Sequence, residues 1–237
     1  MENAIYATLT RQAGLMAQMQ VVANNIANLS TVGFKAEGVT FTEYVRRTGT
    51  GESLSMAAAH GRETALAQGP LERTGGSFDL AIEGEGFFLV ETPQGPRLTR
   101  AGAFTPDAAG NLVTAQGYRL LDAGGAPVFV PLAEGPVGIA ADGTISAGGR
   151  PVGQIGLVVP RDPLALRREA GTLFSAPQTD PAPAGRILQG FLEKSNVDPV
   201  MEVARLIAVS RAYEAGQAFL DREDERIRKT IQAIQTR

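Results

Sequence analysis

The first stretch of the chain carries apolar side chains at helical spacing. In steps of four and three from Ile5 to Ile26, six of seven positions are apolar, and the exception is Gln12. A sustained repeat of this kind is typical of the seam of a coiled-coil-like helix. The segment contains no proline, although Gly14 costs about 1 kcal/mol relative to alanine. The pattern predicts a long amphipathic helix over residues 2–29.

The last stretch of the chain repeats this arrangement. Asp198 followed by Pro199 is typical of a helix start, because the carboxylate accepts from free N–H groups and proline needs no amide donor there. From Val203 to Ile234, seven of ten positions in steps of three and four are apolar. Charges of both signs at 221–229 are typical of a solvated face. A second long amphipathic helix is therefore predicted after residue 198.

Between these segments the apolar period changes to two. Short alternating or apolar stretches, such as 77–82 and 87–90, are separated by turn sequences at 92–96 and at Asp142-Gly143. This spacing predicts short strands joined by tight turns. Residues 36–75 are rich in Gly, Ala, Ser and Thr and predict an extended connector.

These patterns predict an α+β chain in which an all-β domain is inserted between two terminal helices that form a coiled-coil-like domain. The expected boundaries are 1–35 for the N-terminal helix, 36–75 for the connector, 76–190 for the β domain and 191–237 for the C-terminal helix. A single helix pair buries only part of each apolar stripe. We therefore expect the rest of each stripe to contact other subunits.

Composition removes most kinds of chemical site. The chain has 237 residues, no cysteine, and one histidine at position 60. Disulfides, thiolate metal sites, cysteine nucleophiles and a three-histidine zinc site within one chain are therefore excluded. We expect His60 to be a solvated loop residue. The formal charge of −3 provides no basic excess for binding nucleic acid.

The remaining candidate chemistry is weak. Glu83-Gly-Glu-Gly contains a GxG, but strand residues follow it instead of the third glycine and the helix of a nucleotide-binding fingerprint. Glu83 and Glu85 form a carboxylate pair, but sugar clefts are usually lined with aromatic side chains and the chain has no tryptophan. We expect no catalytic residue, cofactor, metal or small-molecule substrate. No apolar run approaches the roughly 18 residues of a membrane span, and we expect no cleaved secretion signal.

Two adjacent amides, Asn24 and Asn25, are unusual inside an amphipathic helix because asparagine lowers helix propensity. One interpretation places them on a solvated face. The other has them hydrogen-bonding across a helix interface, where polar seam residues fix the register. The sequence leaves both interpretations open.

Three stretches resemble the signatures of bacterial flagellar rod and hook proteins. Residues 23–28 read ANNIAN and residues 31–35 read TVGFK, while 193–197 read EKSNV and 211–214 read RAYE. The stretch from Asp79 to Phe104 resembles the β domain of the same family. The three signatures occur in the order in which that family has them.

This resemblance implies an axial structural subunit of the flagellar basal body, spanning the periplasm and exported through the flagellar type III apparatus. It implies proximal- and distal-rod subunits as partners. The short segment from Tyr44 to Phe78 favours the proximal rod, because distal-rod proteins typically have a longer segment there. The alternatives are a distal-rod subunit, a non-flagellar secreted oligomeric binding module, and a secreted enzyme whose terminal helices serve only for oligomerisation.

The helical seams and the signature residues are the expected subunit interface, whose rigid packing would transmit torque by resisting twist. The predicted interface residues are Ile5, Leu9, Met16, Met19, Asn24, Asn25, Ile26, Asn28, Gly33, Phe34, Glu193, Ser195, Asn196, Val197, Val203, Leu206, Arg211, Tyr213, Glu214, Leu220 and Ile227.

Overall fold

The structure, a computed structural model, describes residues 2–46, 54–182 and 184–235. The chain separates into two compact units, which are called the helical unit and the β-rich unit below. The helical unit comprises Met1–Ala27, Ala36–Ala65 and Val197–Arg237. The β-rich unit comprises Asn28–Lys35 and Leu66–Asn196.

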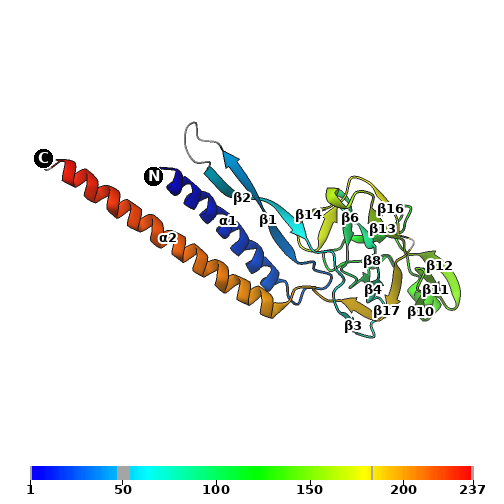
Figure 1. Ribbon diagram of the computed structural model, residues 1–237. Coiled ribbons are helices and arrows are strands. Elements are labelled where there is room, and N and C mark those ends of the chain that lie inside the picture. Colours follow the sequence, from blue (N-terminus) through cyan, green and yellow to red (C-terminus); the bar gives the residue numbers. More distant parts are fainter. Residues whose placement is uncertain (1, 47–53, 183, 236–237) are drawn as a thin grey trace. The chain divides into compact units, whose positions relative to one another are not determined.

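The helical unit combines two long helices with a strand pair. Its elements are α1 (Glu2–Ala27), β1 (Glu37–Arg46), β2 (Leu54–Thr64) and α2 (Pro199–Gln235). Figure 1 shows α1 and α2 side by side, with β1 and β2 along α1. The helices run in opposite directions, because Asn25 of α1 contacts Glu202 while Gln12 contacts Tyr213. Both terminal helices predicted from the apolar spacing are thus present.

The predicted start of the second helix is confirmed at the level of its cap. The Asp198 carboxylate accepts from the backbone N–H of Val200 at 2.9 Å and of Met201 at 3.0 Å. Pro199 follows as the first residue of α2. The side chain thereby satisfies N–H groups that have no partner within the first helical turn.

Residues 36–75 contain strand pairing that their composition did not predict. Strands β1 and β2 pair antiparallel from Glu37 opposite Thr64, with an irregularity between Thr40 and Phe41. Valine, threonine and phenylalanine in β1 favour the extended backbone. The small residues of β2 gave no comparable signal, although its backbone completes the ladder with β1.

The β-rich unit is built from short strands and two 3₁₀ turns. Every strand pairing among the described residues is antiparallel. The strands are β3 (Leu71–Arg73), β4 (Leu80–Glu83), β5 (Phe87–Thr92), β6 (Gly95–Thr99), β7 (Thr105–Pro106), β8 (Leu112–Val113), β9 (Arg119–Leu121), β10 (Val137–Ile139), β11 (Thr144–Ala147), β12 (Arg150–Gln154), β13 (Leu157–Pro160), β14 (Arg167–Arg168), β15 (Leu173–Ser175), β16 (Thr179–Pro181), β17 (Arg186–Gln189) and β18 (Phe191–Glu193). The 3₁₀ turns are η1 (Leu132–Glu134) and η2 (Pro163–Ala165).

Strand β5 lies at the centre of the largest sheet of the described residues. That sheet runs in the order β14-β15-β6-β5-β9-β8-β7, and β13 joins β5 to β16. Strands β10, β11 and β12 form a separate meander, while β4 pairs with β17 and β3 with β18. These last two pairings bring the beginning and the end of the β-rich unit together.

The core of the β-rich unit follows the predicted apolar stretches. Phe88 and Val90 of β5 are buried with Leu120 of β9. The rings of Phe88 and Phe104 meet edge to face, with 5.4 Å between their centroids. Burial of these side chains, at about 25 cal/mol per Å² of apolar surface, is the main force holding the strands together.

The predicted turn at Asp142-Gly143 is confirmed. Asp142-Gly143 joins β10 to β11, with Gly143 at φ +86°. The Asp142 carboxylate accepts from the backbone N–H of Thr144 at 2.9 Å. The Glu83-Gly-Glu-Gly stretch is the turn between β4 and β5, in which Gly84 has a φ of +91°. With its helices and its β-rich middle, the chain is of the α+β class.

Candidate functional site

Asn25 is the polar centre of the helical unit. It lies on α1 and is fully buried. Its amide nitrogen donates to the Glu202 carboxylate of α2 at 3.3 Å and to the backbone carbonyl of Glu37 in β1 at 2.8 Å. Its oxygen accepts from the backbone N–H of Glu37 at 2.9 Å. One side chain therefore joins three elements of this unit.

The neighbouring amide behaves differently. Asn24 is exposed, and its nitrogen lies 3.5 Å from the Glu37 carboxylate. Of the two interpretations left open by the sequence, the solvated face applies to Asn24 and the bond across a helix interface to Asn25. Successive residues point about 100° apart on a helix, and here the two adjacent amides point into different environments.

The two asparagines form a matched pair for measurement. We expect Asn25→Ala to lower the free energy of unfolding of the helical unit by about 1–3 kcal/mol, because it leaves a buried N–H and carbonyl unpaired. Asn24→Ala should change it by less than about 0.5 kcal/mol. Thermal melting followed by far-ultraviolet circular dichroism checks both variants. Equal melting curves would contradict the role assigned to Asn25.

Glu193 is the corresponding centre of the β-rich unit. Its carboxylate is fully buried and lies 2.6 Å from the Lys35 ammonium and 3.3 Å from the Arg100 guanidinium. It also accepts from the backbone N–H of Gly69 at 2.9 Å. Lys35 donates in addition to the carbonyl of Ala67 at 2.8 Å. Two cations and one carboxylate thus form a buried cluster, called the Glu193 cluster below.

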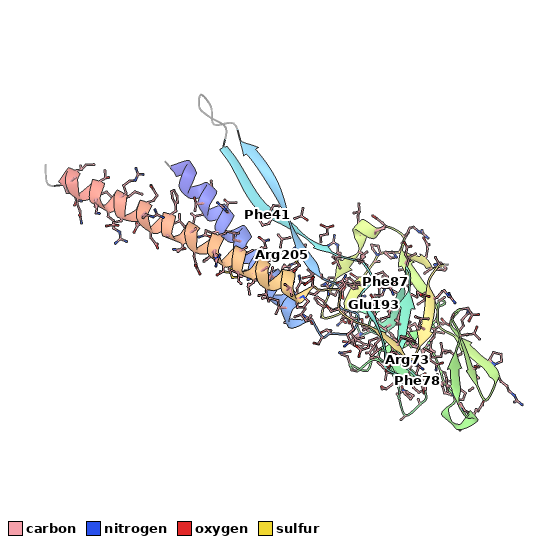
Figure 2. All side chains as sticks on the ribbon, turned by 60° about the horizontal axis from the view of Figure 1, so that its bottom comes forward. Phe41, Arg73, Phe78, Phe87, Glu193 and Arg205 are labelled. Atoms are coloured by element: carbon pink, nitrogen blue, oxygen red, sulfur yellow. The ribbon has the colours of Figure 1, made fainter. Side chains whose placement is uncertain are left out.

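The electrostatics of this cluster are dominated by loss of water. Burial lowers the pKa of Lys35 and of Arg100, and the Glu193 carboxylate opposes both shifts. Arg100 also donates to the carbonyl of Gly84 at 2.8 Å and lies 5.3 Å from the centroid of the Phe87 ring. Figure 2 labels Phe87 and Glu193 close together. Buried charges of this kind are stable only when such partners are complete.

A third cation, Arg168, contacts the segment that contains Lys35. The Arg168 guanidinium lies 4.6 Å from the ring centroid of Phe34 and 4.8 Å from that of Phe174. It also donates to the backbone carbonyl of Lys35. The sequence did not single out Arg100 or Arg168. Arg100 lies inside the stretch that resembles the family's β domain, which is the one signal that could have identified it.

Gly33 allows residues 31–35 to lie close against the rest of the β-rich unit. Its φ is +69°, and a Cβ atom there would lie 2.2 Å from the backbone nitrogen of Ala101. Its N–H donates to the Glu193 carbonyl at 2.7 Å, and the Asn196 N–H donates to the Phe34 carbonyl at 3.3 Å. The two signature segments, 31–35 and 193–197, are therefore paired with each other within this chain.

The predicted interface residues fall into three groups by exposure. The buried group has partners within the chain, and the exposed group is available to other molecules. Buried are Asn25, Gly33, Phe34, Glu193, Ser195 and Val197. Half-buried are Met19, Ile26, Asn28, Asn196, Leu206, Tyr213 and Leu220. Exposed are Leu9, Met16, Asn24, Val203, Arg211, Glu214 and Ile227. The side chain of Ile5, and that of His60, lie outside the described part of the structure.

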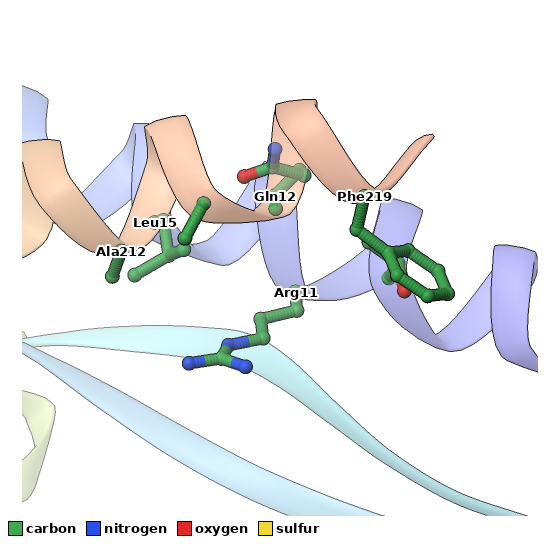
Figure 3. Close-up of a pocket in the computed structure, with 8 residues that line it drawn as sticks. Arg11, Gln12, Leu15, Ala212 and Phe219 are labelled. Carbon is green, nitrogen blue, oxygen red and sulfur yellow. The ribbon is translucent and has the colours of Figure 1, made fainter. Parts of the chain in front are cut away.

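The face of α1 that meets α2 differs from the predicted seam. Gln12, the one polar seam residue, is buried and donates to the Tyr213 carbonyl at 2.9 Å, and Figure 3 shows its amide beside α2. Leu9 and Met16, on the same predicted seam, remain 49% and 43% exposed. An apolar stripe that is wider than the surface of the helix packed on it keeps one edge exposed to solvent. The uncovered edge here is apolar.

The described residues contain no group of three His, Asp or Glu side chains placed to hold a metal ion. Within the same residues, neither helix is long and apolar enough to cross a membrane.

Comparison with known proteins gives the same family at three places. Residues 5–35 match the family described as "Flagella basal body rod protein". Residues 81–147 match "Flagellar hook protein FlgE/F/G D1 domain", and residues 188–233 match "Flagellar basal body rod FlgEFG protein C-terminal". Asn25, the Glu193 cluster and the exposed residues Leu9 and Met16 all lie in these matched segments.

Similarity to individual proteins extends over nearly the full chain. The flagellar basal-body rod protein FlgF of Caulobacter vibrioides is 40% identical, covering 99% of this chain and 98% of that protein. FlgF of Mesorhizobium japonicum is 38% identical over 93% of this chain and 92% of its own length. The basal-body rod protein FlgG of Bacillus subtilis is 30% identical over 98% of both. The chain therefore belongs to the FlgE/F/G family of flagellar rod and hook proteins and is a structural rod subunit, most like FlgF.

Proposed function

We propose that this chain is an axial subunit of the proximal rod, in which α1 and α2 pack against the helices of neighbouring subunits. The observation that carries this proposal is the apolar edge left uncovered on the helical unit. Leu9 and Met16 on α1, with Val203 and Ile227 on α2, are all at least 41% exposed. Leu9 and Met16 lie two turns apart on one face of α1, and exposed apolar side chains that share a face mark interaction surfaces.

The interface proposed here uses the exposed and half-buried residues of the prediction. The buried signature residues instead stabilise each subunit, because the polar groups of Asn25 and Glu193 bind partners within the chain. A rigid subunit with an apolar edge transmits torque through packing contacts that resist twist. In this proposal the terminal helices form a coiled-coil-like inner part, and the β domain at 76–190 lies outside it.

Export through the flagellar type III apparatus, across the periplasm to the growing rod, is part of the same proposal. The chain contains no cysteine, so it can pass through a channel unfolded and refold without mispaired disulfides. Other rod subunits are its proposed partners. Because the chain belongs to a family of structural proteins, a role as a rod subunit is favoured over a role as an enzyme or as a non-flagellar binding module.

The distal rod is the second candidate position. The similarity to FlgG of Bacillus subtilis, at 30% identity over 98% of this chain, supports it. The 40% identity to FlgF of Caulobacter vibrioides favours the proximal rod.

A deletion strain tests the proposal. Removing the gene should abolish motility and stop basal-body assembly before the distal rod and hook are added. Reintroducing the chain should restore both. A motile deletion strain would refute the structural role. A completed proximal rod without a distal rod would instead assign the chain to the distal rod.

A further inference from the structure

The first strands of the β-rich unit have the last strands of the same unit as their partners. Strand β4 pairs with β17, which Figure 1 shows beside it, and β3 pairs with β18. Among the described residues these are the only strand pairings of β3 and β4. Leu80, Ala81 and Ile82 of β4 are fully buried. Before β17 is in place, backbone groups of this strand lack their partners, which is unfavourable away from water.

A side chain of β17 also binds the meander formed by β10, β11 and β12. The Gln189 oxygen accepts from the backbone N–H of Ile139 at 3.0 Å, and its nitrogen donates to the Val137 carbonyl at 3.1 Å. Residues 186–196 are called the closing segment below. They connect the start of the β-rich unit to its meander, so two parts of the unit depend on them.

The closing segment supplies the carboxylate of the Glu193 cluster as well. Lys35 precedes Glu193 by 158 residues and Arg100 precedes it by 93. Lys35 and Arg100 are only 1% and 5% exposed. Glu85 also attracts Arg100, but Glu85 is exposed and water screens it. Without Glu193 both cations would be buried without the carboxylate that they share, and removing such a charge from water is costly.

We propose that the closing segment determines when the β-rich unit folds, and that the Glu193 charge permits this folding. The ribosome adds residues from the N-terminus onward, so the closing segment follows almost all the residues that it contacts. Until it is present, β4 lacks its partner and the two cations oppose burial, so the unit stays unfolded. In an exported chain this delay keeps the unit open for passage through a channel, a consequence that rests on the proposed function.

Refolding of the full chain from urea tests this order of events. Pulse-labelling hydrogen exchange is measured at the amides of β5 and β6, so it reports the β-rich unit separately from the helices. Glu193→Gln keeps the shape of the side chain and removes its charge, and it should slow refolding of the unit about 30-fold or more. The control Glu72→Gln removes the exposed partner of Lys194 in the closing segment, and it should slow refolding by less than about fivefold.

A second substitution tests whether charge is the cause. Lys35→Met removes the cation nearer to Glu193, at 2.6 Å, and keeps an unbranched apolar side chain. Combined with Glu193→Gln, it should recover at least about tenfold of the lost refolding rate, because one cation instead of two then remains without the carboxylate. A double variant that refolds no faster than Glu193→Gln alone would contradict the role given to charge.

Two results would overturn the proposal. If Glu193→Gln speeds unfolding and leaves the refolding rate unchanged, Glu193 takes its place after the unit has folded. If that variant does not fold, the wild-type chain decides. Its Gly69 N–H, which donates to the Glu193 carboxylate, should become protected in the same phase as β5 and β6. Protection of β5 and β6 at least about tenfold earlier would show that the sheet folds without the closing segment.

The refolding experiments use the purified chain, whereas the deletion strain tests the rod assignment. A failed result for the closing segment therefore leaves the rod assignment standing.

Discussion

Replacing Glu193 by alanine should lower the free energy of unfolding of the β-rich unit by about 3–5 kcal/mol. The variant removes the carboxylate that lies 2.6 Å from Lys35 and 3.3 Å from Arg100. Both cations then remain buried without the carboxylate that they share, and the Gly69 N–H loses its acceptor. Urea unfolding followed by near-ultraviolet circular dichroism measures the change.

A surface ion pair on the same strands provides the control. Glu72 of β3 pairs with Lys194, and both side chains are about half exposed. Glu72→Ala should therefore cost only about 0.2–1 kcal/mol, because water screens the pair. A loss below 1 kcal/mol for Glu193→Ala, or equal losses for both variants, would show that the Glu193 cluster does not hold the unit together.

Replacing Met16 by aspartate should abolish assembly while leaving the subunit folded. Met16 is 43% exposed on α1, so the change removes little packing within the chain and its own effect on stability stays within about 1 kcal/mol. A carboxylate buried between subunits without a partner costs several times more. We expect the amount of chain in purified basal bodies to fall by at least about 100-fold, which corresponds to about 2.8 kcal/mol.

The matched variant Met16→Leu keeps an apolar side chain of similar volume and should support normal motility. Motility in soft agar and circular dichroism of the purified subunit are measured together for both variants. Met16 is preferred to Met19, because Met19 is half-buried and its substitution would disturb the fold as well. Full motility with Met16→Asp would show that the apolar edge of α1 is not part of the interface between subunits.

The elements that could be predicted are those that a pattern of neighbouring residues in the sequence specifies. The repeat from Ile5 to Ile26 predicted α1, and Asp198-Pro199 marked the start of α2. Asp142-Gly143 predicted a hairpin turn, because glycine readily adopts the positive φ that such a turn needs. Each of these signals lies within a few residues of the structure that it specifies.

What could not be predicted depends on residues far apart in the chain. Glu193 pairs with Arg100 and with Lys35, and no local pattern connects those positions. The signature residues were therefore assigned to contacts between subunits, although the structure shows that Glu193 and Asn25 have partners within the chain. The periodicity likewise could not decide which edge of α1 meets α2, since both edges are apolar. Gln12 is buried and donates to the Tyr213 carbonyl, whereas Met16 is 43% exposed.

The proposal that the chain is a subunit of the proximal rod is tested most directly by locating the chain in the basal body. Basal bodies would be purified from a strain carrying a tag in the exposed turn at Asp162–Leu164 of the β-rich unit and then labelled with gold-conjugated antibody. We expect label on the rod, on the side nearer the cytoplasmic membrane, in motile cells. Motile cells whose purified basal bodies lack the tagged chain would contradict it.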